Sequence, residues 1–292
     1  MDRLTIGGAT VAIANGRTSP GWSIEPFRRP FAGGEGDPLL SLRARPLGAP
    51  PVGSGVVVWE SGNGWRVVET EGSLNLLFFK ERQCRSLYRM YCIDRDWRSG
   101  TVHLAASRHA RSFPLNHPVE QLVFMSLLGR AGGLVVHSTG VIHRGIGWVF
   151  AGTHGAGKST LARLFRRDPE MTLLNDDRTV IRRVGGQWRV FGTPWSGTVQ
   201  HASAESAPLE AIFLIRHGKR TRARRLTPDA AAARVVPRCL HPYWDRQAVE
   251  GLLATTGRLV CEIPCYDFPF TPHLASVLGA LESVKFKLAN SP

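Results

Sequence analysis

The chain has 292 residues, of which 43 % are hydrophobic and 21 % are charged. This composition is typical of a folded globular protein and argues against disorder, and the length allows one large domain or two modest ones. The apolar runs are shorter than the roughly 18 residues that a membrane span needs, and the N-terminus lacks the layout of a secretory signal. We therefore expect a cytoplasmic protein without a membrane partner.

Basic residues outnumber acidic ones by 37 to 23, which gives a formal net charge of +14. Such an excess can indicate nucleic acid, an anionic surface or an acidic substrate as partner. Arg accounts for 32 of the 37 basic residues, a bias that a GC-rich coding sequence also produces. Because no basic strand carries interleaved aromatic residues, an RNA-binding sheet is not indicated, and nucleic acid is not an expected partner.

Three regions follow one another along the chain. Residues 1–54 are rich in Pro and Gly and are predicted to be an irregular N-terminal segment with one possible strand, 4–13. Residues 55–117 contain five short apolar runs separated by turn signals such as Ser61-Gly-Asn-Gly64, a pattern typical of a small antiparallel sheet. This region is interpreted as a β-rich N-terminal subdomain.

From residue 118 to residue 292 the pattern alternates between helices and strands, as in an α/β domain. A helix is expected to begin at Pro118 and to end at Gly132-Gly133, because Pro favours a first turn and Gly ends a helix. The further predicted elements are strands 134–141 and 148–151, a helix 159–167, a strand 171–174, a hairpin of 178–184 and 187–191, a strand 209–215, helices 228–236 and 245–255, a strand 258–263 and a closing helix 272–286.

The segment Gly152-Thr-His-Gly-Ala-Gly-Lys-Ser159 matches the P-loop pattern G-x-x-x-x-G-K-[ST] in full, between a predicted strand and a predicted helix. Its glycines allow backbone amides to surround phosphates, Lys158 can reach the β and γ oxygens, and the Ser159 hydroxyl can bind Mg²⁺. The alternative is a Gly-rich turn without a ligand. The predicted ligands are ATP and Mg²⁺, and the predicted nucleotide-binding residues are Gly152, Thr153, His154, Gly155, Ala156, Gly157, Lys158, Ser159 and Thr160.

Two adjacent carboxylates, Asp176 and Asp177, follow the predicted strand 171–174, which we expect to neighbour the P-loop strand. One can hold Mg²⁺, and the other can accept a proton from an attacking hydroxyl. A solvated turn or an N-cap pair is the alternative. His137 interrupts an apolar strand, and it is either a core histidine or a group near the phosphates.

Two further features, a turn and a basic run, admit two interpretations each, and the cysteines admit one. The turn Gly192-Thr-Pro-Trp-Ser-Gly197 either walls the acceptor or nucleotide site or buries Trp195. The basic run 217–225 is either a solvated loop or a clamp for phosphate or an acidic peptide. The five cysteines lack CxxC spacing and are interpreted as structural thiols, with Cys261 and Cys265 on a strand and its exit.

The order of these motifs resembles HPr kinase/phosphorylase and, more closely, the smaller HPr-kinase-like proteins of ribosomal peptide pathways, such as lasso-peptide kinases. The resemblance covers about residues 55–285 and is strongest over 118–197. Two departures are the lack of a glycine-rich signature after the aspartates and the presence of Ser138 where several relatives have Ala. The residues that carry the resemblance are Leu134-Val-Val-His137 with Gly140, Gly147-Trp-Val-Phe-Ala-Gly152, Leu174-Asn-Asp-Asp177 with Val180, and Thr193-Pro-Trp195.

The resemblance implies an α/β fold with a phosphoenolpyruvate-carboxykinase-like P-loop domain and a small β-rich N-terminal part. It implies transfer of the γ-phosphate of ATP to a serine hydroxyl of a peptide or small protein, and a homo-oligomer. By position, Lys158 and Ser159 contact phosphates and Mg²⁺, Asp176 is the base, Asp177 assists or holds metal, and His137 contacts phosphate or supports a residue that does. The departures argue against HPr as the acceptor and against reverse phosphorolysis.

Two other functions share the P-loop. A nucleotide-gated binding module of a peptide-modifying assembly would bind ATP without turning it over, and its recognition surface would include the run 217–225. A small-molecule kinase would use an Arg-rich lid, which Arg220–Arg225 could mimic. The paired aspartates and the histidine strand favour the serine kinase.

Overall fold

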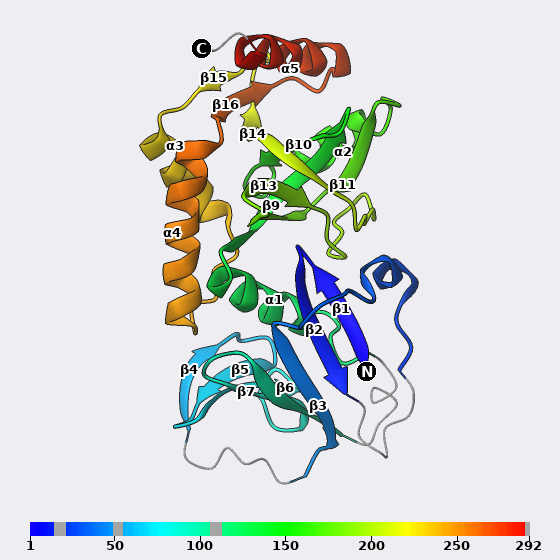
Figure 1. Cartoon of the computed structure of the whole chain (residues 1–292), viewed down its shortest axis with the longest axis vertical. Helices are drawn as coiled ribbons and strands as arrows, with labels where there is room; N and C mark the ends of the chain where they lie inside the picture. The colour runs from blue at the N-terminus through cyan, green and yellow to red at the C-terminus, as the bar shows by residue number, and fades with distance from the viewer. Residues whose placement is uncertain (15–21, 49–54, 106–112, 290–292) are drawn as a thin grey trace. The chain divides into compact units, whose positions relative to one another are not determined.

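The computed structural model describes residues 1–14, 22–48, 55–105 and 113–289, and the chain divides into two compact units (Figure 1). The first unit comprises residues 1–127 and 242–246, and the second comprises residues 128–241 and 247–292. Both units combine helices with a large sheet. Within the described residues, no helix is both long and apolar enough to cross a membrane.

One eight-stranded sheet, in the order β1-β2-β3-β8-β7-β6-β5-β4, forms the framework of the first unit. Its neighbours pair antiparallel except β2–β3 and β3–β8, which are parallel. Strands β4 to β8 confirm the five predicted strands. The bounds are β1 (Asp2–Ile6), β2 (Ala9–Ala14), β3 (Leu40–Pro46), β4 (Val56–Glu60), β5 (Trp65–Glu69), β6 (Ser73–Phe79), β7 (Leu87–Asp94) and β8 (Ser99–Leu104).

The prediction that residues 1–54 are irregular is wrong for the described part of that segment. Gly7 and Gly8 have φ values of 61° and 70° and turn the chain between β1 and β2, so the single strand expected over 4–13 is a hairpin. Strand β3 lies between β2 and β8 in the sheet. Residues 118–127 and 242–246, predicted to belong to the kinase domain, group with the first unit.

A buried ion pair joins two elements of the first unit, the 3₁₀ helix η1 (Pro26–Phe31) and α1 (Val119–Arg130). Arg28 donates hydrogen bonds of 2.7 Å from Nε and from Nη2 to the two carboxylate oxygens of Glu120. The two side chains are only 4 % and 1 % exposed. Because the fork of the guanidinium matches the carboxylate, both partners of this pair are hydrogen-bonded although they lie away from water.

The second unit carries the α/β layer that the sequence predicts from residue 134 onward. Strands β11, β10, β14 and β16 run parallel to one another, and β9 pairs antiparallel with both β10 and β11. The bounds are β9 (Gly133–His143), β10 (Ile146–Ala151), α2 (Lys158–Phe165), β11 (Met171–Asn175), β12 (Arg178–Val184), β13 (Gln187–Phe191), β14 (Ser206–His217), β15 (Arg224–Arg225), α3 (Pro228–Val235), η3 (Val236–Arg238), α4 (Arg246–Glu262), β16 (Cys265–Phe270) and α5 (Leu274–Ala289).

Two long strands, β9 and β14, each change partner along their length. Residues 133–137 of β9 pair with β12, and residues 138–143 pair with β10 on one side and, from 140 onward, with β11 on the other. Strand β14 pairs first with β13 and then with β10 and β16. The pairings β10-β9-β12-β13-β14-β10 therefore close into a ring, and β9 changes partner close to His137.

Alternation along β10 separates the two cores of this layer, as expected for a strand buried on both faces. Trp148 and Phe150 pack in a cluster with residues of α2 and α5. Val149 and Ala151 pack in a second cluster with residues of α3 and α4. Helices therefore cover both faces of the parallel strands.

The strand predicted over 258–263 is wrong, because α4 continues to Glu262 and the strand that follows it is β16. Pro264 lies between the two elements and is incompatible with a helix that continues through it. Cys261 is consequently an exposed helical residue, whereas Cys265 is buried at the start of β16. All five cysteines are free thiols.

Candidate nucleotide-binding and phosphotransfer site

The predicted site residues follow the carboxyl ends of the parallel strands of the second unit. Strand β10 leads into the P-loop, β11 leads into the aspartate pair, and β14 and β16 end at His217 and Phe270. Ligands of open α/β sheets bind at this edge. The expectation that β11 neighbours β10 is wrong, because β9 lies between them; both strands nevertheless end on the same side, since both pair antiparallel with β9.

The P-loop has the backbone geometry of a phosphate cradle. Gly155 and Gly157 have φ values of 76° and 101°, in the left-handed region that favours glycine. Gly157 is the N-cap of α2 and offers no side-chain cap, so the first amides of the helix are left for another acceptor. A Cβ at Gly157 would lie 2.6 Å from the ring of Phe270, which restricts this position to glycine.

The basic run 217–225 begins at the P-loop. His217 Nε2 lies 2.7 Å from the carbonyl oxygen of Gly155, and its ring stacks on Phe270 with 6.4 Å between centroids. The run then folds back, so that Arg224 and Arg225 form β15, the edge strand beside β16. The end of the run is therefore a strand rather than a loop, and the side chains of Arg224 and Arg225 are exposed to water.

Lys158 is folded against its own loop. Its Nζ donates hydrogen bonds of 3.0 and 2.9 Å to the carbonyl oxygens of Gly152 and Thr153, and the residue is only 7 % exposed. Burial holds the pKa of the ammonium below its ordinary value, and the nearby charge of Asp177 offsets part of that effect. A phosphate arriving in the loop would provide the negative charge that the buried ammonium favours.

Asp176 fastens the loop that follows Trp195. Its carboxylate is 1 % exposed and accepts the N–H groups of Gly197 and Val199, each at 2.8 Å. Thr198 lies between these two residues, and its hydroxyl is 2.8 Å from that of Ser159. The predicted turn 192–197 therefore ends one residue before Thr198, the residue that contacts the predicted Mg²⁺ ligand. Trp195 itself is buried.

Asn175 creates the bend that separates the two aspartates. Its fully buried side chain accepts the N–H groups of Asp177 and Arg178 at 2.8 Å each, a local pattern typical of Asn in turns. It also donates to the carbonyl oxygen of Thr193 at 2.9 Å. Asp176 therefore binds the backbone of the 197–199 loop, while Asp177 contacts the side chains of His137 and Arg178.

Asp177 lies among cationic and imidazole groups. Its Oδ1 is 2.7 Å from Nε2 of His137, its Oδ2 accepts a hydrogen bond from Nη1 of Arg178, and its side chain is 20 % exposed. Burial raises the pKa of this carboxyl, but the hydrogen bond from His137 and the charges of Arg178 and Lys158 outweigh burial and lower it overall. Asp177 is therefore an ionised carboxylate that is open to solvent.

Two arginines complete this cluster and were not singled out from the sequence. The Nε atoms of Arg178 and Arg238 are buried and have no hydrogen-bond partner among the described residues. Arg238 ends η3 beside Cys239, which bridges to Val136 of β9, and its charge contributes to the lowered pKa of Lys158. Since the chain contains 32 arginines, no sequence signal distinguishes these two from the rest.

The structure thus brings Lys158, Asp177 and His137 together, and Thr139 connects the backbone of Lys158 to that of Asp176, the neighbour of Asp177. Thr139 Oγ1 donates to the carbonyl oxygen of Lys158 at 3.0 Å and lies 3.5 Å from that of Asp176. In the described part of the chain, no three His, Cys, Asp or Glu side chains are grouped to hold a metal ion. Mg²⁺ commonly needs only one or two carboxylates besides phosphate oxygens, and the hard oxygens of Ser159 and Asp177 fit that requirement.

Comparisons with known proteins do not identify a function for this site, so its interpretation rests on the geometry described above. No protein-family model and no curated protein matches the chain. Among solved structures, the HPr(Ser) kinase/phosphatase of Coxiella burnetii is similar over 53 % of this chain and 99 % of its own, with 9 % identity and a TM-score of 0.33. At that TM-score the similarity does not define a shared fold, so the resemblance to HPr kinases stays a prediction.

Proposed function

We propose that the second unit is an ATP-dependent kinase that transfers the γ-phosphate to a serine hydroxyl of a peptide or small protein. The observation that carries the proposal is the position of the Asp177 carboxylate, bound to His137 and Arg178, at the same sheet edge as a complete P-loop. The ring of strands beside a helix-covered parallel layer supports a phosphoenolpyruvate-carboxykinase-like P-loop fold.

The backbone amides of the P-loop and the first turn of α2 would bind the phosphate chain. Lys158, Arg178 and Arg238 would supply positive charge around the transferred group, which is the main demand of phosphoryl transfer. The unpartnered Nε atoms of the two arginines are suited to phosphate oxygens, because a buried donor without an acceptor is unfavourable. When bound, Mg²⁺ would neutralise phosphate charge, held by Ser159 and Asp177.

The geometry favours Asp177 rather than Asp176 as the group that receives the proton. Both carboxylates are hydrogen-bonded through both oxygens, but Asp176 is 1 % exposed and bound to backbone amides, whereas the side chain of Asp177 is 20 % exposed and bound to side chains. The serine oxygen would bond to the γ-phosphorus as the bond from that phosphorus to the β–γ bridging oxygen breaks. The serine proton would pass to Asp177, whose position His137 fixes through its 2.7 Å hydrogen bond. Asp176 would hold the 197–199 loop.

The test is phosphotransfer followed by mass spectrometry. The full chain is incubated with Mg·ATP and a pool of serine-containing peptides, beside Lys158→Ala, which we expect to lose ATP binding and transfer together. A phosphate gained on one peptide and absent with the variant supports the serine kinase. ATP binding without ADP or phosphopeptide would favour the binding module, and ADP without phosphopeptide would favour a small-molecule acceptor or simple hydrolysis.

A further inference from the structure

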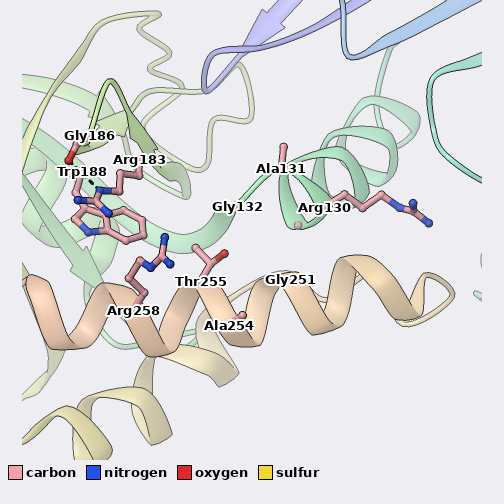
Figure 2. A pocket seen from close by; sticks show the side chains of 11 residues that line it. Arg130, Ala131, Gly132, Arg183, Gly186, Trp188, Gly251, Ala254, Thr255 and Arg258 are labelled. Carbon is pink, nitrogen blue, oxygen red and sulfur yellow. Dashed lines mark hydrogen bonds between the residues drawn. The ribbon is translucent and has the colours of Figure 1, made fainter.

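The second unit contains a cavity of about 640 Å³ that the proposed kinase chemistry does not use (Figure 2). This volume lies within the range of small-molecule sites. The cavity lies between the end of α1, the β12–β13 hairpin and α4. Its lining residues are Gly129, Arg130, Ala131, Gly132, Arg183, Gly186, Trp188, Gly251, Ala254, Thr255 and Arg258.

Small residues on the two helices leave this space open. The end of α1 and α4 approach so closely that a Cβ at Gly251 would lie 2.2 Å from the carbonyl oxygen of Gly129. Beyond this crossing, Ala131, Gly132 and Ala254 line the cavity and have too little side chain to fill it. The hollow therefore follows from helix packing at glycine, and the larger polar side chains lie at its margin.

The cavity has an excess of positive charge. Three of its lining residues are Arg130, Arg183 and Arg258, and none of the lining residues is acidic. The neighbouring carboxylate, Glu262, accepts a 2.8 Å hydrogen bond from Trp188 Nε1 and lies 3.7 Å from Arg183 Nη2. Arg130 donates to the side chain of Gln247, so two guanidiniums and one carboxylate remain beside Trp188, and this excess of positive charge suits an anion.

Three of the lining side chains gather at one end. Figure 2 shows Arg258 pointing from α4 towards the hairpin that carries Arg183 and Trp188, whereas Arg130 points the other way and the Thr255 hydroxyl is turned towards Gly132. Arg183 Nε donates to the carbonyl oxygen of Gly186 at 2.9 Å, which fixes the orientation of its guanidinium. The buried indole of Trp188 supplies an apolar wall beside these donors.

We propose that this end of the cavity binds a small phosphorylated molecule through Arg183 and Arg258, with Trp188 against its apolar part. Two guanidiniums match a phosphate, which carries a charge near −2 and several acceptor oxygens, better than a carboxylate with one charge and two oxygens. The site is separate from the P-loop: β9 leaves the cavity at Gly133 and reaches His137 roughly 13 Å further on, at about 3.3 Å per residue.

Isothermal titration calorimetry tests this site in the Lys158→Ala background, in which we expect the P-loop to bind phosphate weakly. The probes are inorganic phosphate and glycerol 3-phosphate, with acetate as the carboxylate comparison. We expect both phosphates to bind more tightly than acetate, and Arg258→Ala to weaken them at least tenfold. Arg258 is exposed and Ala suits a helix, so this variant is expected to fold.

Two variants serve as controls in the same background. Arg258→Lys keeps the charge but loses the planar fork, so we expect it to bind phosphate with intermediate affinity. Arg43→Ala removes the same charge from an exposed position on β3 of the first unit and leaves affinity unchanged. Absence of phosphate binding, equal binding of acetate, or equal losses from Arg258→Ala and Arg43→Ala would each overturn the proposal.

Discussion

Both units bury charged side chains, but they satisfy them differently. In the first unit, Arg28 and Glu120 form a two-pronged pair that connects positions 92 residues apart, and each partner is almost completely buried. In the second unit, Lys158 donates to carbonyl oxygens of its own loop. Arg178 and Arg238 keep buried Nε atoms without acceptors in the described chain, as Arg66 does in the first unit, but these two lie near the P-loop lysine, whose pKa their charges lower.

The difference separates a structural use of charge from a ligand-binding one. A buried pair whose atoms are matched holds two segments in register, and removing one partner leaves an uncompensated charge. A cluster of donors that exceeds its acceptors has free capacity for an anion, and perturbed titratable groups in such a cluster are characteristic of functional sites. We therefore expect variants of the first unit to lose stability and variants of the second to lose phosphate chemistry.

The largest expected effect is that of Asp177→Asn on transfer. The amide cannot receive the serine proton, so we expect the transfer rate to fall by about 10²–10⁴-fold, while the dissociation constant for ATP measured without Mg²⁺ changes little. Rapid-quench measurement with the peptide substrate and equilibrium ATP binding give the two quantities. Asp176→Asn is the comparison, and it is expected to lower thermal stability by loosening the 197–199 loop. A larger loss of rate in Asp176→Asn, without a loss of stability, would restore Asp176 as the base.

The buried Arg28–Glu120 pair of the first unit predicts a large effect on stability rather than on transfer. Glu120→Ala leaves Arg28 buried with its main acceptor removed, so the free energy of unfolding is expected to fall by about 3–5 kcal/mol. Urea unfolding followed by far-UV circular dichroism measures this change. The double variant Arg28→Met/Glu120→Leu is expected to recover most of it, because neither charge is then buried. A loss below about 1 kcal/mol would mean that the pair behaves like an exposed salt bridge.

Arg238→Met tests whether the arginines near Lys158 bind phosphate. It removes a donor that has no acceptor at Nε and the hydrogen bond from Nη1 to the carbonyl oxygen of Arg234, but it keeps much of the side-chain volume. The free energy of unfolding is therefore expected to fall by only about 1 kcal/mol. A hydrogen bond to a charged group contributes about 1.5–3 kcal/mol, so ATP binding is expected to weaken by roughly 10–100-fold. Fluorescence titration with a labelled nucleotide measures the affinity, with exposed Arg166→Met as the matched control. Equal affinities of the two variants would contradict the assignment of free donors to phosphate.

The sequence predicts the parts of this cluster that are contiguous and misses those that the fold assembles. The P-loop is recognisable because its glycines, Lys158 and Ser159 are adjacent. His137 and Asp177 are recognisable as candidates, but their contact spans 40 residues and depends on where β9 changes partner. Arg238 reaches the site only because η3 leads into the bridge between Cys239 and Val136, and no local pattern reports that connection.

The fold shows the same division between local and non-local information. The alternating runs of β4 to β8 and of the β12–β13 hairpin were predictable, because period-two patterns and turn residues are local signals. The Pro and Gly content of residues 1–54 concealed β3, whose parallel pairing with β2 and β8 joins segments far apart in the chain, and it reduced the β1–β2 hairpin to a single predicted strand. The apolar run 258–263 fits either helix or strand, and packing of α4 with the core of α3 decides for helix.

The smallest expected effect is the pH dependence of stability that Asp177 contributes. The pKa of its carboxyl is lowered in the folded chain, so the ionised form stabilises the native state. That contribution is fully present above the unfolded pKa, about 3.9, and is lost as pH falls through the folded pKa. The difference in free energy of unfolding between wild type and Asp177→Asn is therefore expected to shrink below about pH 4. Urea unfolding between pH 3 and pH 7, near the ordinary carboxyl range, measures it; a difference that grows on acidification would contradict the pairing of Asp177 with the cationic cluster.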